Sequence, residues 1–299
     1  MIERIPFHGE LLSLLTAFAW AWAVILFKKS GERVHPLALG LFKNTMGMVL
    51  FPLTMLLVGQ PLGHAAPGLH QIMLIASGAL GIGIADTLFF ACLNRLGAGR
   101  AAIVSCLYSP FIIALSIPFL GESLAALQLV GAIAIALAVV IGTWRGDRRA
   151  KDGGHILQGV ILGIISMACN ALGIVMIKPL LAHSPILWVT QMRLVGGAVV
   201  LAAGILARRD RAVVATSLYR GGNIRYTVAA SFVGGYVSMI LWLAGMKFTL
   251  ASVASALNET STIFIFLLSA VFLHEPITSR RMAGIALGFA GALLVTFGR

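Results

Sequence analysis

The sequence predicts an all-α integral membrane protein of ten transmembrane helices, arranged as two inverted five-helix repeats. Three observations lead to this fold class. The chain is too apolar for a water-soluble domain, its apolar residues fall into ten runs long enough to cross a bilayer, and the second half of the chain repeats the pattern of the first half.

The composition excludes a soluble protein. Of the 299 residues, 59% are hydrophobic and only 11% are charged, whereas about a quarter of the residues in a soluble domain are charged. The formal net charge of +12 is typical of nucleic-acid binding, but that needs a basic face on a water-soluble domain, for which the chain has no room. We therefore expect the lipid bilayer and no nucleic acid as a partner. The three cysteines lack the spacing of zinc ligands, so we expect no metal and no cofactor.

Ten apolar runs account for roughly two-thirds of the chain. A helix needs about 20 apolar residues to cross a hydrocarbon core about 30 Å thick, and lipid offers no partner to backbone amides outside a helix. The runs cover residues 9–27, 37–58, 71–93, 100–120, 126–143, 156–177, 186–207, 226–247, 251–273 and 279–297. The connections between them are short, so we expect no extramembrane domain.

The basic residues orient these spans. Ten spans put both termini on one side, and the connections then carry sixteen Lys and Arg on one side against four on the other. Cytoplasmic loops are enriched in Lys and Arg. We therefore expect a multi-pass protein of a bacterial-type inner (plasma) membrane with both termini outside the cytoplasm.

The two halves of the chain correspond in sequence. The turn Leu120-Gly121-Glu122-Ser123-Leu124 matches Leu273-His274-Glu275-Pro276-Ile277 at an offset of 153 residues, and Lys43 matches Arg193 at an offset of 150. The charged segment 145–154 lies between the halves and is predicted to be a cytoplasmic linker. Each half has five spans, an odd number, so the second repeat (155–299) enters the membrane inverted relative to the first (1–144), as in many secondary transporters.

These motifs resemble the EamA type of the drug/metabolite transporter superfamily. Each half ends in a turn like L-G-E-x-L and then a helix rich in Gly, Ala and Ile, at 126–143 and 279–297. His274 departs from the usual glycine in the second copy. The resemblance implies a secondary transporter, not an enzyme, that exports small metabolites such as amino acids by alternating access, typically in exchange for protons.

Four charged residues lie inside the predicted spans: Lys43, Asp86, Arg193 and Glu259. A charge near the bilayer centre costs at least about 2.5–3.5 kcal/mol, so each is a candidate functional residue. Two acids and two bases also complement the ammonium and carboxylate of an amino acid. Structural ion pairs between helices are the alternative interpretation. Glu259 and Asp86 are the candidates for proton coupling, and Glu259 is preferred because it lies among polar neighbours.

Five further polar or aromatic residues are predicted to line a substrate cavity. Asn258 adjoins Glu259 in a polar stretch within an apolar span, and Trp20 lies mid-span, although Trp normally collects at the interface. Asn170 follows Trp20 by 150 residues, so the same depth in the other half is polar, and Tyr108 and Trp242 are the two other aromatic candidates. Ordinary helix packing is the alternative for each of them.

Other classes of protein fit less well. An integral-membrane enzyme would need a catalytic motif, and HExxH, GxSxG and phosphate-binding loops are all missing from the sequence. A nucleoside or xenobiotic efflux protein stays open as an alternative to an amino acid exporter. The pairs Gly159/Gly163 and Gly284/Gly288 have a spacing that serves close helix packing, either within the bundle or between the subunits of a homodimer.

Overall fold

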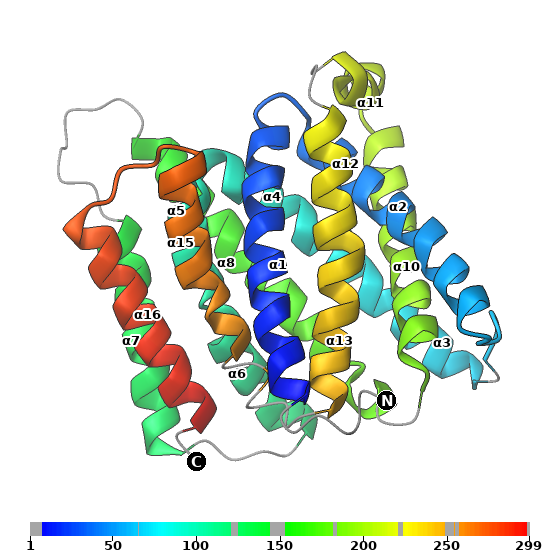
Figure 1. Cartoon of the computed structure of the whole chain (residues 1–299), viewed down its shortest axis with the longest axis horizontal. Helices are drawn as coiled ribbons and strands as arrows, with labels where there is room; N and C mark the ends of the chain where they lie inside the picture. Colours follow the sequence, from blue (N-terminus) through cyan, green and yellow to red (C-terminus); the bar gives the residue numbers. More distant parts are fainter. Residues whose placement is uncertain are drawn as a thin grey trace.

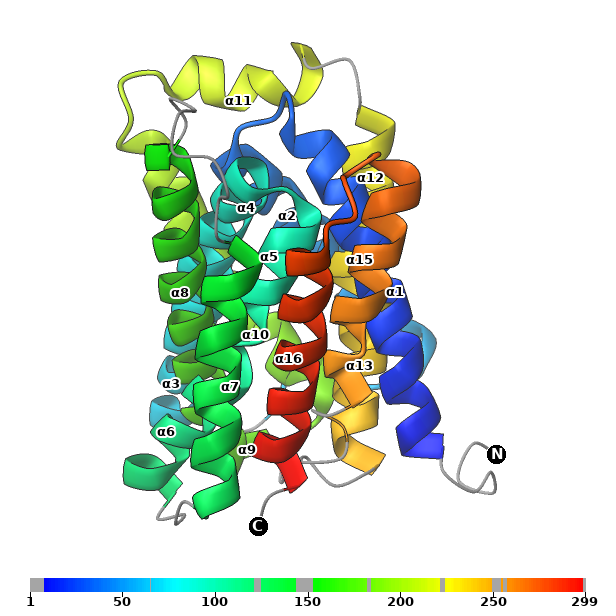
Figure 2. The same ribbon diagram turned by 90° about the vertical axis from the view of Figure 1, so that its left-hand side faces the viewer.

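A computed structural model shows an all-helical bundle (Figures 1 and 2) and describes residues 8–64, 66–120, 125–143, 153–181, 184–220, 224–248, 254 and 257–297. Every regular element among these residues is a helix. The elements are α1 (His8–Gly31), α2 (Pro36–Leu57), α3 (Gly68–Gly78), η2 (Ala79–Ile84), α4 (Ala85–Leu96), α5 (Ala98–Ser105), α6 (Tyr108–Leu120), α7 (Ala126–Thr143), α8 (Gly153–Val175), α9 (Lys178–Leu181), α10 (Ile186–Leu206), α11 (Arg211–Arg220), α12 (Ile224–Phe232), η3 (Val233–Val237), α13 (Ser238–Phe248), α15 (Ser261–Phe272) and α16 (Ser279–Phe297).

The membrane class is confirmed, whereas the number of spans is not. Eight helices in the described part of the chain are long and apolar enough to cross a membrane, beginning with Gly9–Gly31 and ending with Ile224–Gly245. The ninth predicted run appears as a shorter helix, Leu257–Phe272, because residues 249–253 and 255–256 lie outside the described residues. The tenth run forms α16, which begins at Ser279 and carries Arg280 and Arg281 in its first turn. The predicted linker 145–154 lies outside the described residues except for 153 and 154.

The connection between α10 and α12 contains a helix that the sequence did not predict. The ten residues of α11, Arg211–Arg220, are too polar to be an apolar run. They lie across one end of the bundle (Figures 1 and 2), and α1 begins and α16 ends at the opposite end. His35 in the α1–α2 connection contacts this helix, because its backbone N–H donates to Ser217 Oγ at 3.1 Å.

Four of the long helices are interrupted near their centres. The segment α3–α4 contains the π-helical turns of η2, and α12–α13 contains those of η3. A turn at Cys106–Leu107 separates α5 from α6, and Thr260 precedes α15. Pro110 lies near the break between α5 and α6. The break lies just before it, and Pro110 occupies the first turn of α6, where its missing N–H has no helical partner to lose.

Helices from the two halves pack directly on one another. The element pairs α2–α10 and α7–α16 are both in contact, and α4–α8 and α1–α13 also cross between the halves. Gly284 and Gly288 of α16 lie against Gly142 and Ala138 of α7, and a Cβ on Gly284 would come within 2.9 Å of the Gly142 Cα. The glycine pairs identified in the sequence thus serve packing within the bundle, because Gly159 and Gly163 likewise lie against side chains of this chain.

A further contact between the two halves lies at the end of the bundle that carries α11. The Glu275 carboxylate accepts hydrogen bonds from the backbone N–H groups of Ala98 (2.6 Å) and Gly99 (3.2 Å) and pairs with Arg281 at 3.2 Å. It therefore caps the N-terminus of α5, where exposed N–H groups favour an anion. The matching Glu122 lies outside the described residues. His274 has a φ of 53°, the left-handed conformation that glycine adopts most readily.

Candidate functional site: a polar cavity inside the bundle

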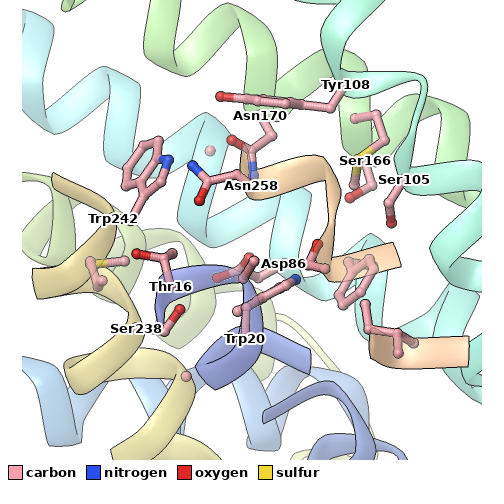
Figure 3. Close-up of a pocket in the computed structure, with 18 of the residues that line it drawn as sticks. Thr16, Trp20, Asp86, Ser105, Tyr108, Ser166, Asn170, Ser238, Trp242 and Asn258 are labelled. Atoms are coloured by element: carbon pink, nitrogen blue, oxygen red, sulfur yellow. The ribbon is translucent and has the colours of Figure 1, made fainter. Parts of the chain in front are cut away.

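A cavity of about 240 Å³ lies inside the bundle. All nine residues predicted from the sequence to line a cavity do so: Trp20, Lys43, Asp86, Tyr108, Asn170, Arg193, Trp242, Asn258 and Glu259. They come from helices of both halves, and Figure 3 shows Trp20, Trp242, Tyr108 and Asn258 turned toward a common space. Polar groups inside apolar helices are tolerated where they line such a space or find a partner within the bundle.

Lys43 and Asp86 form an ion pair at the cavity wall. The Lys43 ammonium of α2 donates to the Asp86 carboxylate in the first turn of α4. The two side chains are only 5% and 13% exposed. Each charge therefore neutralises the other in a place where either alone would be costly.

Arg193 occupies the corresponding position in the second half but has no such partner. Its side chain is 5% exposed, and its Nε is buried without a hydrogen-bond partner. None of the salt bridges among the described residues includes it. Arg193 thus differs from Lys43, the residue that it matches in sequence.

Glycines in the π-helical turns make room for both basic side chains. A Cβ on Gly81 of η2 would lie 3.1 Å from an Arg193 guanidinium nitrogen, and a Cβ on Gly235 of η3 would lie 2.8 Å from the Lys43 Cγ. Each basic side chain therefore lies against a glycine of the opposite half. The clusters of glycine in two otherwise apolar spans could have indicated this close approach in the sequence.

Glu259 is the last of the helical residues 257–259, just before the turn at Thr260 that precedes α15, and is 9% exposed. Its carboxylate accepts a hydrogen bond of 2.8 Å from Ser109 Oγ in the first turn of α6, 150 residues earlier in the chain. This bond joins the interrupted helices of the two halves. Ser109 was not among the predicted site residues, although its position in the polar stretch before Pro110 matches that of Glu259.

The remaining lining is mixed. Trp20 packs near Phe89 with 6.1 Å between ring centroids, and Trp242 adds a second indole. The Asn258 Oδ1 atom is buried without a hydrogen-bond partner among the described residues. Six serine and threonine hydroxyls also line the cavity: Thr16, Ser105, Ser166, Ser238, Ser261 and Thr262. Serine and threonine are so common in membrane helices that their type alone could not identify them.

Outside the spans, His35 caps the N-terminus of α2. Its Nδ1 accepts a hydrogen bond from the Leu37 backbone N–H at 3.2 Å. Burial, and to a lesser extent the charge of Arg208, lower the pKa of His35, and Asp210 opposes them. Arg208 in turn forms a two-pronged ion pair with Asp210, and this hydrogen bonding lowers the pKa of the Asp210 carboxyl. The imidazole is therefore held in the neutral form that the cap requires.

No group of three or more His, Cys, Asp or Glu residues within the described ranges is arranged to hold a metal ion. The described lining residues of the cavity offer side-chain charges, amides, hydroxyls, and aromatic and aliphatic surfaces to a ligand. A cavity lined by charged and polar side chains, among apolar helices that are long enough to cross a bilayer, is typical of a multi-pass membrane protein, and the cavity is its candidate binding site.

The comparisons with known proteins define the family. The sequence model of the EamA-like transporter family matches the chain twice, at residues 7–144 and 157–297, and the chain belongs to this family. The chain is 24% identical over 285 residues to an Archaeoglobus fulgidus protein named uncharacterized transporter, covering 95% of this chain and 96% of that protein. It is 27% identical over 249 residues to the uncharacterized transporter YvbV of Bacillus subtilis, covering 77% and 76% of the two chains.

A solved crystal structure has the same fold. It superposes with a TM-score of 0.67 at 19% sequence identity and covers 97% of this chain and 96% of its own. The family and the two named relatives are transporters, so the protein is a membrane transporter and the resemblance seen in the sequence is confirmed at that level.

Proposed function

We propose that the protein is a secondary transporter that exports small metabolites, amino acids above all, across a bacterial-type inner membrane. The observation that carries this proposal is the cavity, which is lined by two basic and two acidic side chains from both halves, three of them buried and Asp86 largely buried. An amino acid brings one ammonium and one carboxylate, which complement these charges. The apolar and aromatic part of the lining suits an uncharged side chain.

Alternating access between two inverted repeats is the proposed mechanism. The repeats would be residues 1–144 and 155–299, joined by the cytoplasmic linker 145–154. The two matches of the family model support this division, as do the contacts of α2 with α10 and of α7 with α16. Paired interruptions at η2 and η3 give each half a place to bend, and a rocking motion would then expose the cavity to either side in turn.

Glu259 is the residue that we propose for proton coupling. A coupling carboxyl must exist in both charged and neutral forms, which a fixed cationic partner would prevent. Asp86 has such a partner in Lys43, whereas the hydrogen bond that Glu259 accepts comes from the neutral hydroxyl of Ser109. This contrast favours Glu259 over Asp86.

Export from proteoliposomes tests the function. Liposomes are loaded with labelled amino acids, nucleosides and a cationic dye, and efflux is recorded with and without a pH gradient. We expect amino acids to leave the liposomes faster when protons can enter in exchange. Efflux of nucleosides or dye alone would reject the substrate class, and chemical conversion of any compound would indicate an enzyme instead.

Two matched variants test the coupling. Glu259→Gln keeps the shape of the side chain but cannot titrate, so we expect it to lose efflux that depends on the pH gradient while exchange of substrate for substrate continues. Asp86→Asn is the comparison. Normal gradient-driven efflux in Glu259→Gln together with its loss in Asp86→Asn would assign coupling to Asp86.

A reporter fusion tests the orientation. Both termini are proposed to lie outside the cytoplasm, opposite the end where α11 lies (Figure 1). A reporter that is active only in the cytoplasm should therefore be silent when it is fused after Arg299, and a strong signal there would reverse the topology.

A further inference from the structure

The charged side chains around the cavity differ in whether another residue is bonded to them. Lys43 and Asp86 cancel each other through their ion pair. Glu259 is held by a hydroxyl on the other half. Arg193 is the cavity cation for which the described residues supply no salt bridge, although Asp86 and Tyr108 lie within electrostatic range of it. A guanidinium that is 95% removed from solvent without a bonded anion is costly for the folded protein unless a ligand supplies that anion.

The position of Arg193 suits a ligand better than a structural role. The guanidinium borders the cavity and lies against Gly81, where no side chain stands between it and the η2 backbone. Its planar arrangement of N–H donors matches the two oxygens of a carboxylate. One unpaired positive charge calls for one negative charge. A monoanionic carboxylate meets this requirement, whereas a phosphate dianion would add a surplus negative charge beside Asp86 and Glu259.

A second unpaired atom lies on the same cavity and has the opposite hydrogen-bonding character. The buried Oδ1 of Asn258 accepts no hydrogen bond from the described residues, and Figure 3 shows this side chain pointing into the space bordered by Trp242 and Asn170. An amide oxygen next to Glu259 is a suitable acceptor for an ammonium group. The cavity thus offers an unsatisfied donor and an unsatisfied acceptor to the same ligand.

We propose that Arg193 is a carboxylate subsite that orients the substrate, with Asn258 Oδ1 accepting from the substrate ammonium and the aromatic lining receiving an apolar side chain. The inference rests on the proposed function and makes it more specific. It assigns the two ends of an amino acid to named atoms, and it assigns unequal roles to Arg193 and Lys43 although the two residues correspond in sequence. Lys43 keeps Asp86 neutralised, and Arg193 binds.

Equilibrium binding to the purified protein in detergent tests the subsite without requiring transport. Four compounds share one apolar chain: leucine, 4-methylpentanoate without the ammonium, isopentylamine without the carboxylate, and isopentyl phosphate. Titration calorimetry gives each Kd. We expect leucine to bind tightest, 4-methylpentanoate next and isopentylamine weakest. Isopentylamine binding as tightly as leucine, isopentyl phosphate binding tighter than 4-methylpentanoate, or the absence of binding by both carboxylates would each overturn the proposal.

Variants then assign the subsite to atoms. Arg193→Gln should weaken leucine and 4-methylpentanoate by about tenfold to a hundredfold, the usual worth of hydrogen bonds to a charged group, and leave isopentylamine unchanged. Arg193→Lys should restore part of the loss, because it keeps the charge but not the planar fork. Asn258→Leu should remove the preference for leucine over 4-methylpentanoate. Arg208→Gln, an exposed arginine outside the cavity, is the matched control and should bind all four compounds as the wild type does.

The two proposals fail in different ways. Leucine binding that depends on Arg193, without efflux from proteoliposomes, would reject the transport function and leave the subsite in place. Efflux of leucine that is unaffected by Arg193→Gln would leave the transport function and reject the subsite. Because the comparison of the four compounds needs only the wild-type protein, it decides the question even if Arg193→Gln does not fold.

Discussion

The ion pair of Lys43 and Asp86 allows a quantitative prediction about stability. Lys43→Met leaves the Asp86 carboxylate without its partner at a site that is only 13% exposed. Breaking a buried pair in this way typically costs about 3–5 kcal/mol. We expect the lower end of this range, about 3 kcal/mol, because Arg193 still attracts Asp86 after the change. Asp86→Asn should cost about as much, since it leaves the Lys43 ammonium unpaired.

The double variant separates the interaction energy of the ion pair from the effects of the two individual substitutions. Removing both charges, in Lys43→Met with Asp86→Asn, leaves no unpaired charge, so its cost should be only about 1–2 kcal/mol and the coupling energy between the two sites about 3 kcal/mol or more. Unfolding in mixed detergent micelles, followed by circular dichroism, measures the free energies of all four proteins. Costs of the two single variants that simply add up in the double variant would refute the argument.

Arg193→Gln is the matched contrast. It removes a buried charge that has no salt bridge among the described residues, so in the absence of ligand the variant should be as stable as the wild type or more stable by about 1 kcal/mol. A loss as large as that of Lys43→Met would show that Arg193 has a structural partner and would contradict both the unequal roles of the two residues and the carboxylate subsite.

Three further predictions concern the end of the bundle that carries α11. His274→Gly should raise the free energy of unfolding by about 1 kcal/mol, because glycine adopts the left-handed conformation without the clash of a Cβ, whereas His274→Val should lower it. Unchanged thermal unfolding in both variants would show that the backbone at His274 is not strained. Glu275→Leu removes the cap of α5 and should cost about 2–3 kcal/mol, while Glu275→Gln, which keeps an acceptor oxygen, should cost less; equal losses would show that capping is not its role. Because the pKa of His35 is lowered in the folded protein, the unfolded chain takes up a proton first as the pH falls below about 6.5. The stability that this cap contributes is therefore complete above that pH and is lost as the pH falls through the folded-state pKa. His35→Asn keeps a capping acceptor without a titrating group and should lose less stability between about pH 7 and pH 5; a loss equal to that of the wild type would exclude His35 as the cause.

Most of the helices, α11 being an exception, and the charged residues inside them could be predicted from the sequence alone. Both follow from local physics. Lipid forces an apolar segment to satisfy its own backbone, so ten apolar runs predict helices, and each run contains a described helix. A charged side chain in such a helix is costly without a cavity or a partner, so Lys43, Asp86, Arg193 and Glu259 could be selected before any packing was known, and all four line the cavity.

The contacts that these residues make depend on the tertiary structure and could not be predicted from the sequence. Lys43 and Arg193 occupy matching places in the sequence, but one faces Asp86 and the other has no salt bridge among the described residues. Glu275 caps a helix that begins 177 residues earlier in the chain, and the π-helical turns bring glycine backbones against the two basic side chains. These contacts depend on which helix faces stand opposite each other and how closely the backbones approach. The sequence arguments used the 3.6-residue period of a helix and the free-energy cost of burying a charge in lipid. Both describe a single helix, so they predict neither which helix face stands opposite another nor how closely two backbones approach.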